Sequence, residues 1–294
     1  MKNIYDQISD NKIRSATIIS LFISFIFIVS YLITISFDLD NSLLFIAIIF
    51  SSFSSLIGYF KGDQIVLAIN KARPVTREEF FNFYTVVENL SIANHTPVPK
   101  IYVIDSDSPN AFATGRDPQH AIICATIGLL KKLNRTELEG VIAHELSHIK
   151  NYDIRLMTLV SVLIGSLSIL INTATRSTLF RRSNDNNRDS NGILALIGFI
   201  LIIFSPLIAQ IIQLAISRRR EFFADASAVK LTRQPQGLID ALTKISSDAS
   251  VLETASTATA SLYISNPFKK NKLASMFSTH PSIEDRIKAL QQML

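Results

Sequence analysis

Two histidines and a glutamate occur together at residues 144–148, where the chain reads His144-Glu145-Leu-Ser-His148. On an α-helix, residues four apart lie on the same face, so His144 and His148 can bind one ion in adjacent positions. Glu145 lies near the edge of that face and can reach a water molecule held there. The spacing therefore predicts a metal site with a carboxylate base. The alternative interpretation is a surface helix with two exposed histidines.

A catalytic zinc ion needs a third protein ligand and an open fourth position for water. The later segment 218–225 reads Arg-Arg-Arg-Glu-Phe-Phe-Ala-Asp and places Glu221 and Asp225 four residues apart. We expect Glu221 to bind the metal and Asp225 to contact a ligand histidine and fix its tautomer. In the alternative interpretation, Glu221 only neutralises Arg218 and Asp225 faces solvent.

The helix that must carry these histidines has a start signal in the sequence. Thr136 and Glu139 have the spacing of a capping box, which predicts a helix that runs to about Lys150. Other patterns predict a helix, two β-rich runs and a final helix, at residues 76–90, 100–104, 121–126 and 283–292. The chain thus contains a folded α+β part around the predicted site.

The composition points to a membrane protein. Hydrophobic residues make up 48% of the 294 residues, charged residues only 18%, and the mean hydropathy is +0.30. Four apolar segments without charge are each long enough to cross a bilayer, at residues 15–37, 41–60, 156–175 and 190–217. The first is too long for the core of a cleaved signal peptide and is interpreted as a retained anchor. The alternative for the first two segments is a pair of buried core helices.

Flanking positive charges predict the orientation in the membrane. Lys12 and Arg14 precede the first segment and Lys61 follows the second, which places the N-terminus and the folded part on the cytoplasmic side. The basic loop 176–189 disagrees with this rule, so the hairpin 156–217 can be spanning, re-entrant or interfacial. In each case the chain returns to the same side between the histidines and the downstream carboxylates.

These observations predict a mainly α, α+β fold: four hydrophobic helices with a cytoplasmic zincin-like domain that contains a small β-sheet. The expected parts are a membrane hairpin at 1–60, a second hydrophobic hairpin at 156–217, and a metallopeptidase domain formed from 61–155 and 218–294. A net charge of +5 without a dense basic tract argues against nucleic acid as a partner. The single cysteine, Cys124, excludes an intrachain disulfide and is expected to be buried.

Four motifs occur in one order: NAFATG at 110–115, HELSH at 144–148, SRRREFFAD at 217–225 and THP at 279–281. With two apolar segments before and two within, the chain resembles the HtpX-type membrane zinc metallopeptidases, relatives of the CaaX prenyl proteases. The resemblance implies that His144, His148 and Glu221 bind one zinc ion, that Glu145 is the general base and that Asp225 supports a ligand. It further implies a stress-response endopeptidase of the bacterial cytoplasmic (inner) membrane, which cleaves misfolded or damaged membrane proteins at the cytoplasmic face.

Two further groups of residues are candidates for contact with the substrate. His280 and Arg286 are candidates for stabilising the oxyanion that forms during peptide hydrolysis, and the resemblance places a similar His-Pro and Arg near the active site. A short strand with an open edge can pair with an extended peptide, and its residues would be Asn110, Ala111, Phe112 and Ala113. The alternative for this stretch is a buried turn closed by Gly115.

Two rival functions follow from the same sequence. A zinc-stabilised chaperone or scaffold would bind misfolded membrane proteins without cutting them, but the glutamate of HELSH argues against it. A four-helix channel is weaker, because the first three apolar segments contain no ionisable residue to line a path.

Overall fold

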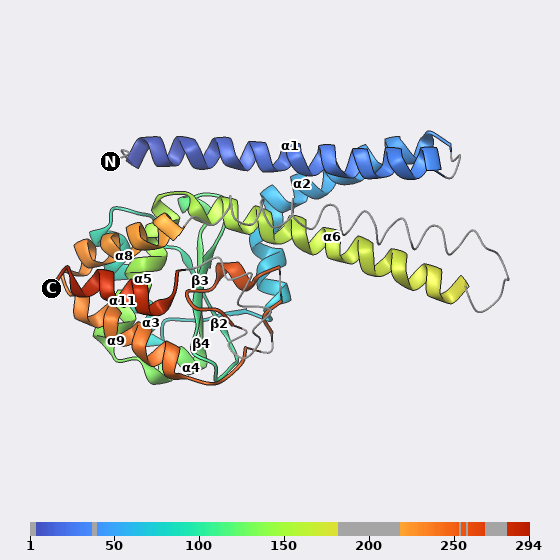
Figure 1. Ribbon diagram of the computed structural model, residues 1–294. Coiled ribbons are helices and arrows are strands. Elements are labelled where there is room, and N and C mark those ends of the chain that lie inside the picture. The colour runs from blue at the N-terminus through green and yellow to red at the C-terminus, as the bar shows by residue number, and fades with distance from the viewer. Residues whose placement is uncertain (1–3, 37–39, 182–217, 253, 257, 268–280) are drawn as a thin grey trace.

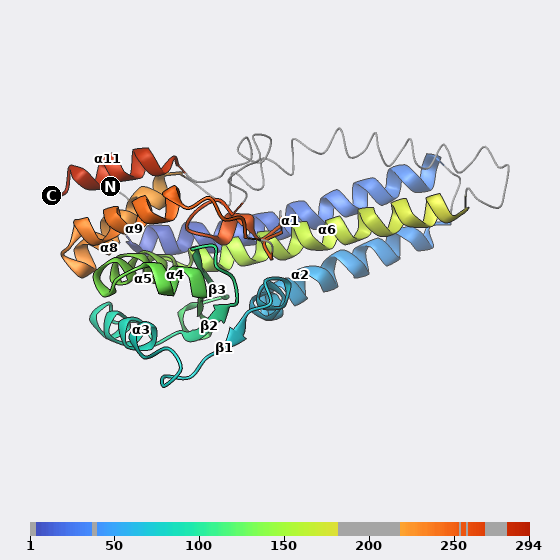
Figure 2. The same cartoon turned by 90° about the horizontal axis from the view of Figure 1, so that it is seen from below.

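Three long helices lie side by side and extend away from a group of shorter helices with a small sheet (Figures 1 and 2). The computed structural model describes residues 4–36, 40–181, 218–252, 254–256, 258–267 and 281–294. The three long helices are α1 (Ile4–Ser36), α2 (Ser42–Ile69) and α6 (Asp153–Arg181). The predicted mainly helical fold with a small β-sheet is therefore confirmed for the described residues, whereas the predicted division into parts stays a prediction.

The packed side of the long helices is apolar, and so is much of their outer surface. A buried cluster joins the three helices through residues that include Ile18 and Phe22 of α1, Ala47 of α2 and Leu159 of α6. On the outside, Phe45, Ile46, Ile49, Phe53 and Leu56 of α2 are all more than half exposed. An apolar surface of this kind suits a lipid environment better than water.

Two of the long helices meet the length and composition needed to span a bilayer, over Ser9–Tyr31 and Leu44–Ile69. They overlap the first two predicted segments, 15–37 and 41–60, which supports membrane insertion. The third predicted segment, 156–175, lies within α6, which does not meet the same test over its described part. The fourth, 190–217, lies outside the described residues. A set of four membrane helices therefore stays a prediction.

The sheet has four strands in the order β1-β2-β4-β3. Its strands are β1 (Arg73–Pro74), β2 (Lys100–Ile104), β3 (Ala111–Thr114) and β4 (Ile122–Thr126). The pair β2 and β4 is parallel, with Tyr102 opposite Cys124, whereas β1 and β3 are antiparallel to their neighbours. Both predicted β-rich runs are confirmed as strands, and Cys124 is buried as expected.

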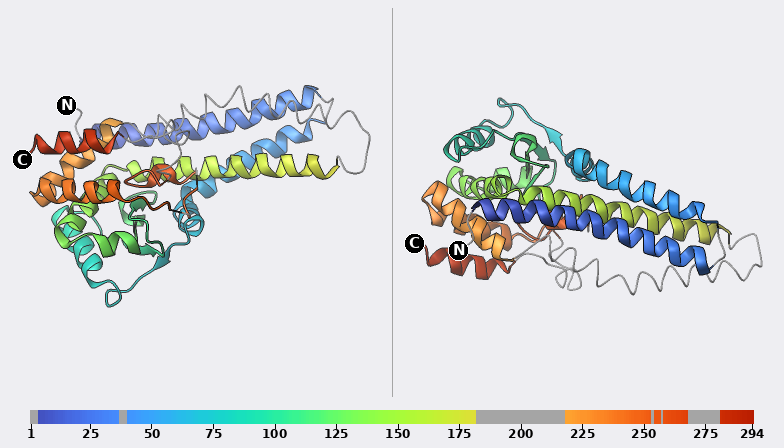
Figure 3. Two further views of the ribbon diagram at one scale, coloured as in Figure 1. Left: turned by 60° about the horizontal axis from the view of Figure 1, so that its bottom comes forward. Right: turned by 90° about the horizontal axis from the view of Figure 1, so that it is seen from above.

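The helix α5 (Arg135–Lys150) lies in the middle of the folded part, with shorter helices on both sides (Figure 3). The elements around it are α3 (Phe81–Ala93), α4 (Ile127–Lys132), α8 (Arg218–Thr232), α9 (Pro235–Ser247) and α11 (Ile283–Gln291). Helix α5 packs directly against α3, α8, α9 and β3. This central position buries nearly all of the predicted metal-binding helix.

The predicted starts of two helices are wrong. The helix expected from residue 76 begins only at Phe81, and the residues before it form a turn in which the Phe80 amide donates to the carbonyl of Thr76. Helix α5 is capped by Asn134 rather than by Thr136. The Asn134 side chain accepts a hydrogen bond from the Glu137 amide (3.0 Å), and the Glu137 carboxylate accepts one from the Asn134 amide (2.9 Å).

A tertiary contact explains the choice between these two overlapping capping signals. Glu137 is buried and accepts a hydrogen bond from Lys244 of α9 at 2.8 Å. Because Lys244 is distant in the sequence, the start of α5 depends on the packing of α9 as well as on local spacing.

Helices α5 and α9 approach closely at a glycine, which gives a prediction about stability. An added Cβ on Gly140 would lie 2.9 Å from the backbone of Leu238 in α9. We expect Gly140→Ala to destabilise the protein by about 1–3 kcal/mol, because the helices must separate. The measurement is thermal unfolding of the purified protein in detergent.

Gly165 of α6 provides the matched control for this substitution. The nearest atom to an added Cβ there is 3.9 Å away. Gly165→Ala should therefore leave stability unchanged or raise it by up to about 1 kcal/mol through helix propensity. A melting temperature that rises in Gly140→Ala would contradict the close contact between α5 and α9.

Candidate metal centre

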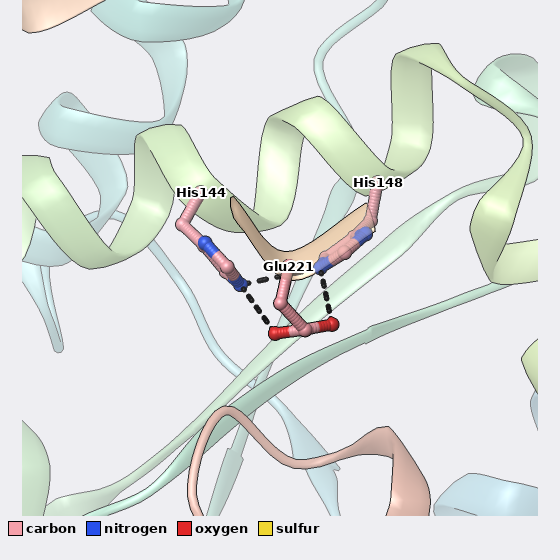
Figure 4. A group of neighbouring side chains, drawn as sticks. All are labelled: His144, His148 and Glu221. Carbon is pink, nitrogen blue, oxygen red and sulfur yellow. Dashed lines mark hydrogen bonds and ion pairs between the residues drawn. The ribbon is translucent and has the colours of Figure 1, made fainter. Parts of the chain in front are cut away.

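Three side chains from two helices converge on one point (Figure 4). His144 and His148 lie on one face of α5, and Glu221 reaches them from the first turn of α8. The two Nε2 atoms are 3.2 Å apart, and the Glu221 carboxylate oxygens lie 3.5 Å from Nε2 of His144 and 3.6 Å from Nε2 of His148. The interpretation of two exposed surface histidines is wrong, since all three residues are buried.

The distances between these donor atoms fit a tetrahedral zinc ion. Zinc bonds to nitrogen and oxygen of about 2.0–2.2 Å place neighbouring ligand atoms roughly 3.3–3.5 Å apart in a tetrahedron. The two Nε2 atoms are 3.2 Å apart and lie 3.5 and 3.6 Å from different oxygens of Glu221, and one ligand atom from each residue fits within 4.8 Å. Two neutral imidazoles and one carboxylate are also a donor set typical of catalytic zinc with one open position. The residues present therefore fit the ion.

Each histidine is oriented by a carboxylate on its other ring nitrogen. Asp225 Oδ1 lies 2.9 Å from His144 Nδ1, and Asp153 Oδ2 lies 3.1 Å from His148 Nδ1. A proton held on Nδ1 leaves the Nε2 lone pair of each ring directed at the common point. Two lone pairs and a carboxylate that face one another repel unless a cation lies between them. The contact expected between Asp225 and a ligand histidine is present.

Arg286 connects α11 to this centre. Its guanidinium donates two hydrogen bonds to Asp225, at 2.8 and 2.6 Å, and a third to the carbonyl of Ile264 at 3.1 Å. Arg286 has no exposed surface and lies 3.3 Å from His144 Nδ1. The donors expected to meet a substrate oxyanion are thus engaged with Asp225, so Arg286 supports a histidine instead. His280, the other oxyanion candidate, lies outside the described residues.

The alternative role for the acidic pair is also wrong. Glu221 and Asp225 are each about 1% exposed, and they contact His144, His148 and Arg286. If these carboxylates only neutralised the arginines of α8, they would be expected at the surface, where an ion pair loses little hydration free energy.

Burial and charge shift the pKa values of the site. Burial alone would raise the pKa of Asp225, but the Arg286 guanidinium holds it below its usual range. Burial and Arg286 act to lower the pKa of His144, yet hydrogen bonds to Asp225 and Glu221 outweigh them and raise it to about 9. Burial raises the pKa of Glu145, although the neighbouring histidines act against this shift. Without a metal, His144 and Glu145 therefore hold a proton more readily than usual, whereas Asp225 releases its proton more readily.

The strand β3 next to the site is not the open edge that the sequence suggested. It is the edge strand of the sheet, but Phe112 forms a β-bridge with Tyr263, and the amide of Ile264 donates to the carbonyl of Ala111 at 2.9 Å. The Asn110 side chain also donates to the carbonyl of Ser265. The expectation of an open edge is wrong at Ala111 and Phe112, because a later part of the chain occupies it.

The alternative interpretation, a buried turn closed by Gly115, applies to the residues that end β3. Gly115 has φ of +136°, and an added Cβ would lie 2.4 Å from the carbonyl oxygen of His120. Both interpretations of the stretch are therefore partly right: Ala111–Thr114 form a strand, and Gly115 closes it.

Asp153 is a member of the site that the sequence did not reveal. It is the first residue of α6, and only Asn151 and Tyr152 separate it from the end of α5. Tyr152 has φ of +61°, so the chain reverses sharply and brings Asp153 back to His148. The sequence feature that could have indicated this contact is an acidic residue shortly after the second histidine, at the start of the next helix.

Comparisons with known proteins extend over nearly the whole chain. The sequence pattern described as peptidase family M48 matches residues 81–294. A "Protease HtpX homolog" of Dictyoglomus turgidum is 44% identical over 292 residues, covering 98% of this chain and 94% of the relative. Another of Streptococcus uberis is 40% identical over 302 residues, covering 99% and 100%.

A solved structure has a similar fold. The crystal structure of S. mikatae Ste24p matches with a TM-score of 0.52 at 22% sequence identity. The match covers 94% of this chain but only 62% of the Ste24p chain, so this chain spans less than two thirds of that protein. At this identity the likeness concerns the fold alone.

Proposed function

Because the chain belongs to peptidase family M48, we propose that it cleaves misfolded or damaged membrane proteins at the cytoplasmic face of a bacterial cytoplasmic membrane. The chain is a zinc-dependent metalloprotease with two apolar helices that can span a membrane. The observation that carries the proposal is the buried convergence of two imidazoles and one carboxylate within 4.8 Å, beside helices whose outer surface is apolar.

In this proposal His144, His148 and Glu221 hold the zinc ion. Bound zinc supplies a Lewis acid that polarises the scissile carbonyl and lowers the pKa of water to about 7. Glu145 takes a proton from the attacking water on its carboxylate and gives it to the leaving amine. The raised pKa of buried Glu145 supports this role, because a base works best when its pKa is near the working pH.

The proposed arrangement in the membrane has two hairpins, at 1–60 and 156–217, and a cytoplasmic domain formed from 61–155 and 218–294. The flanking lysines and arginines support this orientation. The short turn between α5 and α6 supports a site close to the membrane, because α6 leaves the metal centre directly and packs along α1.

The proposed substrate is an unfolded segment in extended conformation. Such a segment would be held through its main chain, which demands little of its sequence. Ala111 and Phe112 of β3 do not offer that pairing, because Tyr263 and Ile264 occupy their edge.

Removal and return of zinc tests the proposed function. We expect a chelator to abolish cleavage of casein by the detergent-purified protein, and added zinc to restore it. His148→Ala should not recover, because one of the three ligands is missing. His120→Ala is the matched control: His120 is an exposed histidine that pairs with Asp117, and its loss should leave recovery intact.

Two outcomes would contradict the proposal. Cleavage by the metal-free protein would exclude a role for zinc in the reaction. Retained binding of unfolded protein with no turnover at any zinc concentration would indicate the zinc-stabilised chaperone instead.

A further inference from the structure

A buried polar cluster joins the first apolar helix to the metal centre. Asp153 of α6 lies at its middle: one carboxylate oxygen contacts His148 Nδ1, and the other accepts hydrogen bonds from Asn11 of α1 (2.8 Å) and Arg220 of α8 (3.1 Å). Asp153 and Asn11 are each 4% exposed. Helices α1, α5, α6 and α8 therefore meet at one carboxylate that touches a metal ligand.

Asn11 also holds the turn that positions this carboxylate. Its side-chain nitrogen donates a second hydrogen bond, of 2.8 Å, to the carbonyl of Asn151, the residue that caps the end of α5. The Asn11 side chain is thus hydrogen-bonded to both ends of the turn between α5 and α6, at Asn151 and at Asp153. The sharp reversal at Tyr152 is fixed from the side of α1.

A polar side chain at this place in α1 needs an explanation. Asn11 precedes the apolar segment 15–37 and stands beside the charged residue Lys12, yet its side chain is buried, whereas Ile18 and Phe22 make apolar contacts further along α1. A buried amide is costly unless its hydrogen bonds are satisfied, and the side-chain nitrogen of Asn11 donates to two acceptors in the turn that follows α5. An apolar residue would anchor the helix as well. The amide is thus specific for the neighbouring site.

We propose that Asn11 and Asp153 are positioning residues for the zinc ligand His148, so that the first apolar helix is part of the metal centre as well as an anchor. Asp153 accepts the Nδ1 proton of His148 and keeps Nε2 directed at Glu221. Asn11 in turn fixes the Asp153 carboxylate. Loss of either residue loosens the ring, and loss of such support typically lowers metal affinity 10–100-fold.

The test measures zinc affinity directly, on the full chain in detergent, by competition with a chelator of known affinity. We expect Asp153→Asn to raise the zinc Kd about 10–100-fold and Asn11→Ala to raise it by a smaller factor. The double variant should bind zinc no more weakly than Asp153→Asn alone, because Asn11 acts through Asp153.

Ser15→Ala is the matched control on the same helix. Ser15 is equally buried, but its hydroxyl donates only to the carbonyl of Asn11 within α1. Its loss should leave the zinc Kd unchanged. The melting temperature of each metal-free variant is measured beside the Kd, since a purely structural role would move that temperature and not the affinity.

Asn11→Ala keeps the test decisive if Asp153→Asn does not fold. Asp153→Asn removes the charge that pairs with the mostly buried Arg220, which can prevent folding. Asn11→Ala leaves the ion pair between Arg220 and Asp153 intact. A wild-type zinc Kd in Asn11→Ala would overturn the proposal. Independent, multiplicative effects of the two substitutions on the Kd would also overturn it.

The inference rests on the zinc site of the proposed function, but the two can fail separately. If the wild-type protein binds zinc tightly and cleaves nothing, the proposed function fails while the effect of Asn11 on zinc affinity can still be measured. If the wild type cleaves casein and Asn11→Ala binds zinc as the wild type does, only the role of α1 fails.

Discussion

Glu145→Gln is expected to lower kcat about 10²–10⁴-fold while the zinc content stays at the wild-type level. Glutamine has nearly the same shape, so it fills the buried position without removing a metal ligand. Its amide cannot take a proton from the attacking water or return one to the leaving amine. The measurements are casein cleavage at saturating substrate and zinc content by elemental analysis.

Glu139→Gln on the same helix is the control for this substitution. Glu139 pairs with Arg135 on the partly exposed side of α5, away from the metal ligands. Its neutralisation should leave both kcat and zinc content unchanged. Cleavage at the wild-type rate by Glu145→Gln would exclude Glu145 as the base. A loss of zinc in that variant would instead indicate a direct role in metal binding.

Arg286→Ala is expected to destabilise the protein by about 3–5 kcal/mol. The substitution leaves the buried carboxylate of Asp225 without its two strongest hydrogen bonds, close to a second carboxylate, Glu221. It also removes the support of the residue that orients His144, so zinc affinity should fall together with stability. Thermal unfolding and chelator competition measure the two effects.

Two other substitutions define the size of this effect. Arg135→Ala removes an arginine from an exposed ion pair with Glu139 and should cost no more than about 1 kcal/mol. Arg286→Lys keeps the positive charge but loses the paired hydrogen bonds, so an intermediate loss is expected. If Arg286→Ala unfolds at the wild-type temperature and binds zinc as the wild type does, the ion pair between Arg286 and Asp225 does not stabilise the packing of α11 against the metal site.

The main features of the site could be read from the sequence because they depend on local spacing. His144 and His148 share a face through helical periodicity, and Glu221 and Asp225 do so for the same reason. The long apolar helices and the strands β2 and β4 follow from composition and β-propensity over short ranges. In each case the residues that decide the structure are close together in the chain.

The features that were missed depend on contacts between distant parts. Asp153 reaches His148 only because Tyr152 adopts a left-handed conformation, which no residue type at that position indicates. Arg286 was expected at the substrate, but its partner Asp225 lies on another helix, and the sequence contains no sign of their pairing. The edge of β3 was expected to be open, and the segment that covers it lies far downstream at Tyr263.

The residues of the site are far apart in the sequence, so they are synthesised at different times. Both histidines lie on α5, whereas the carboxylate that completes the ligand set and the arginine that supports it lie on α8 and α11. At translation rates of about 5–20 residues per second, roughly 7–28 s separate His148 from Arg286. A nascent chain in the membrane therefore exposes the metal-binding helix well before the centre is complete. The proposed zinc site therefore lacks its carboxylate ligand until Glu221 has been made.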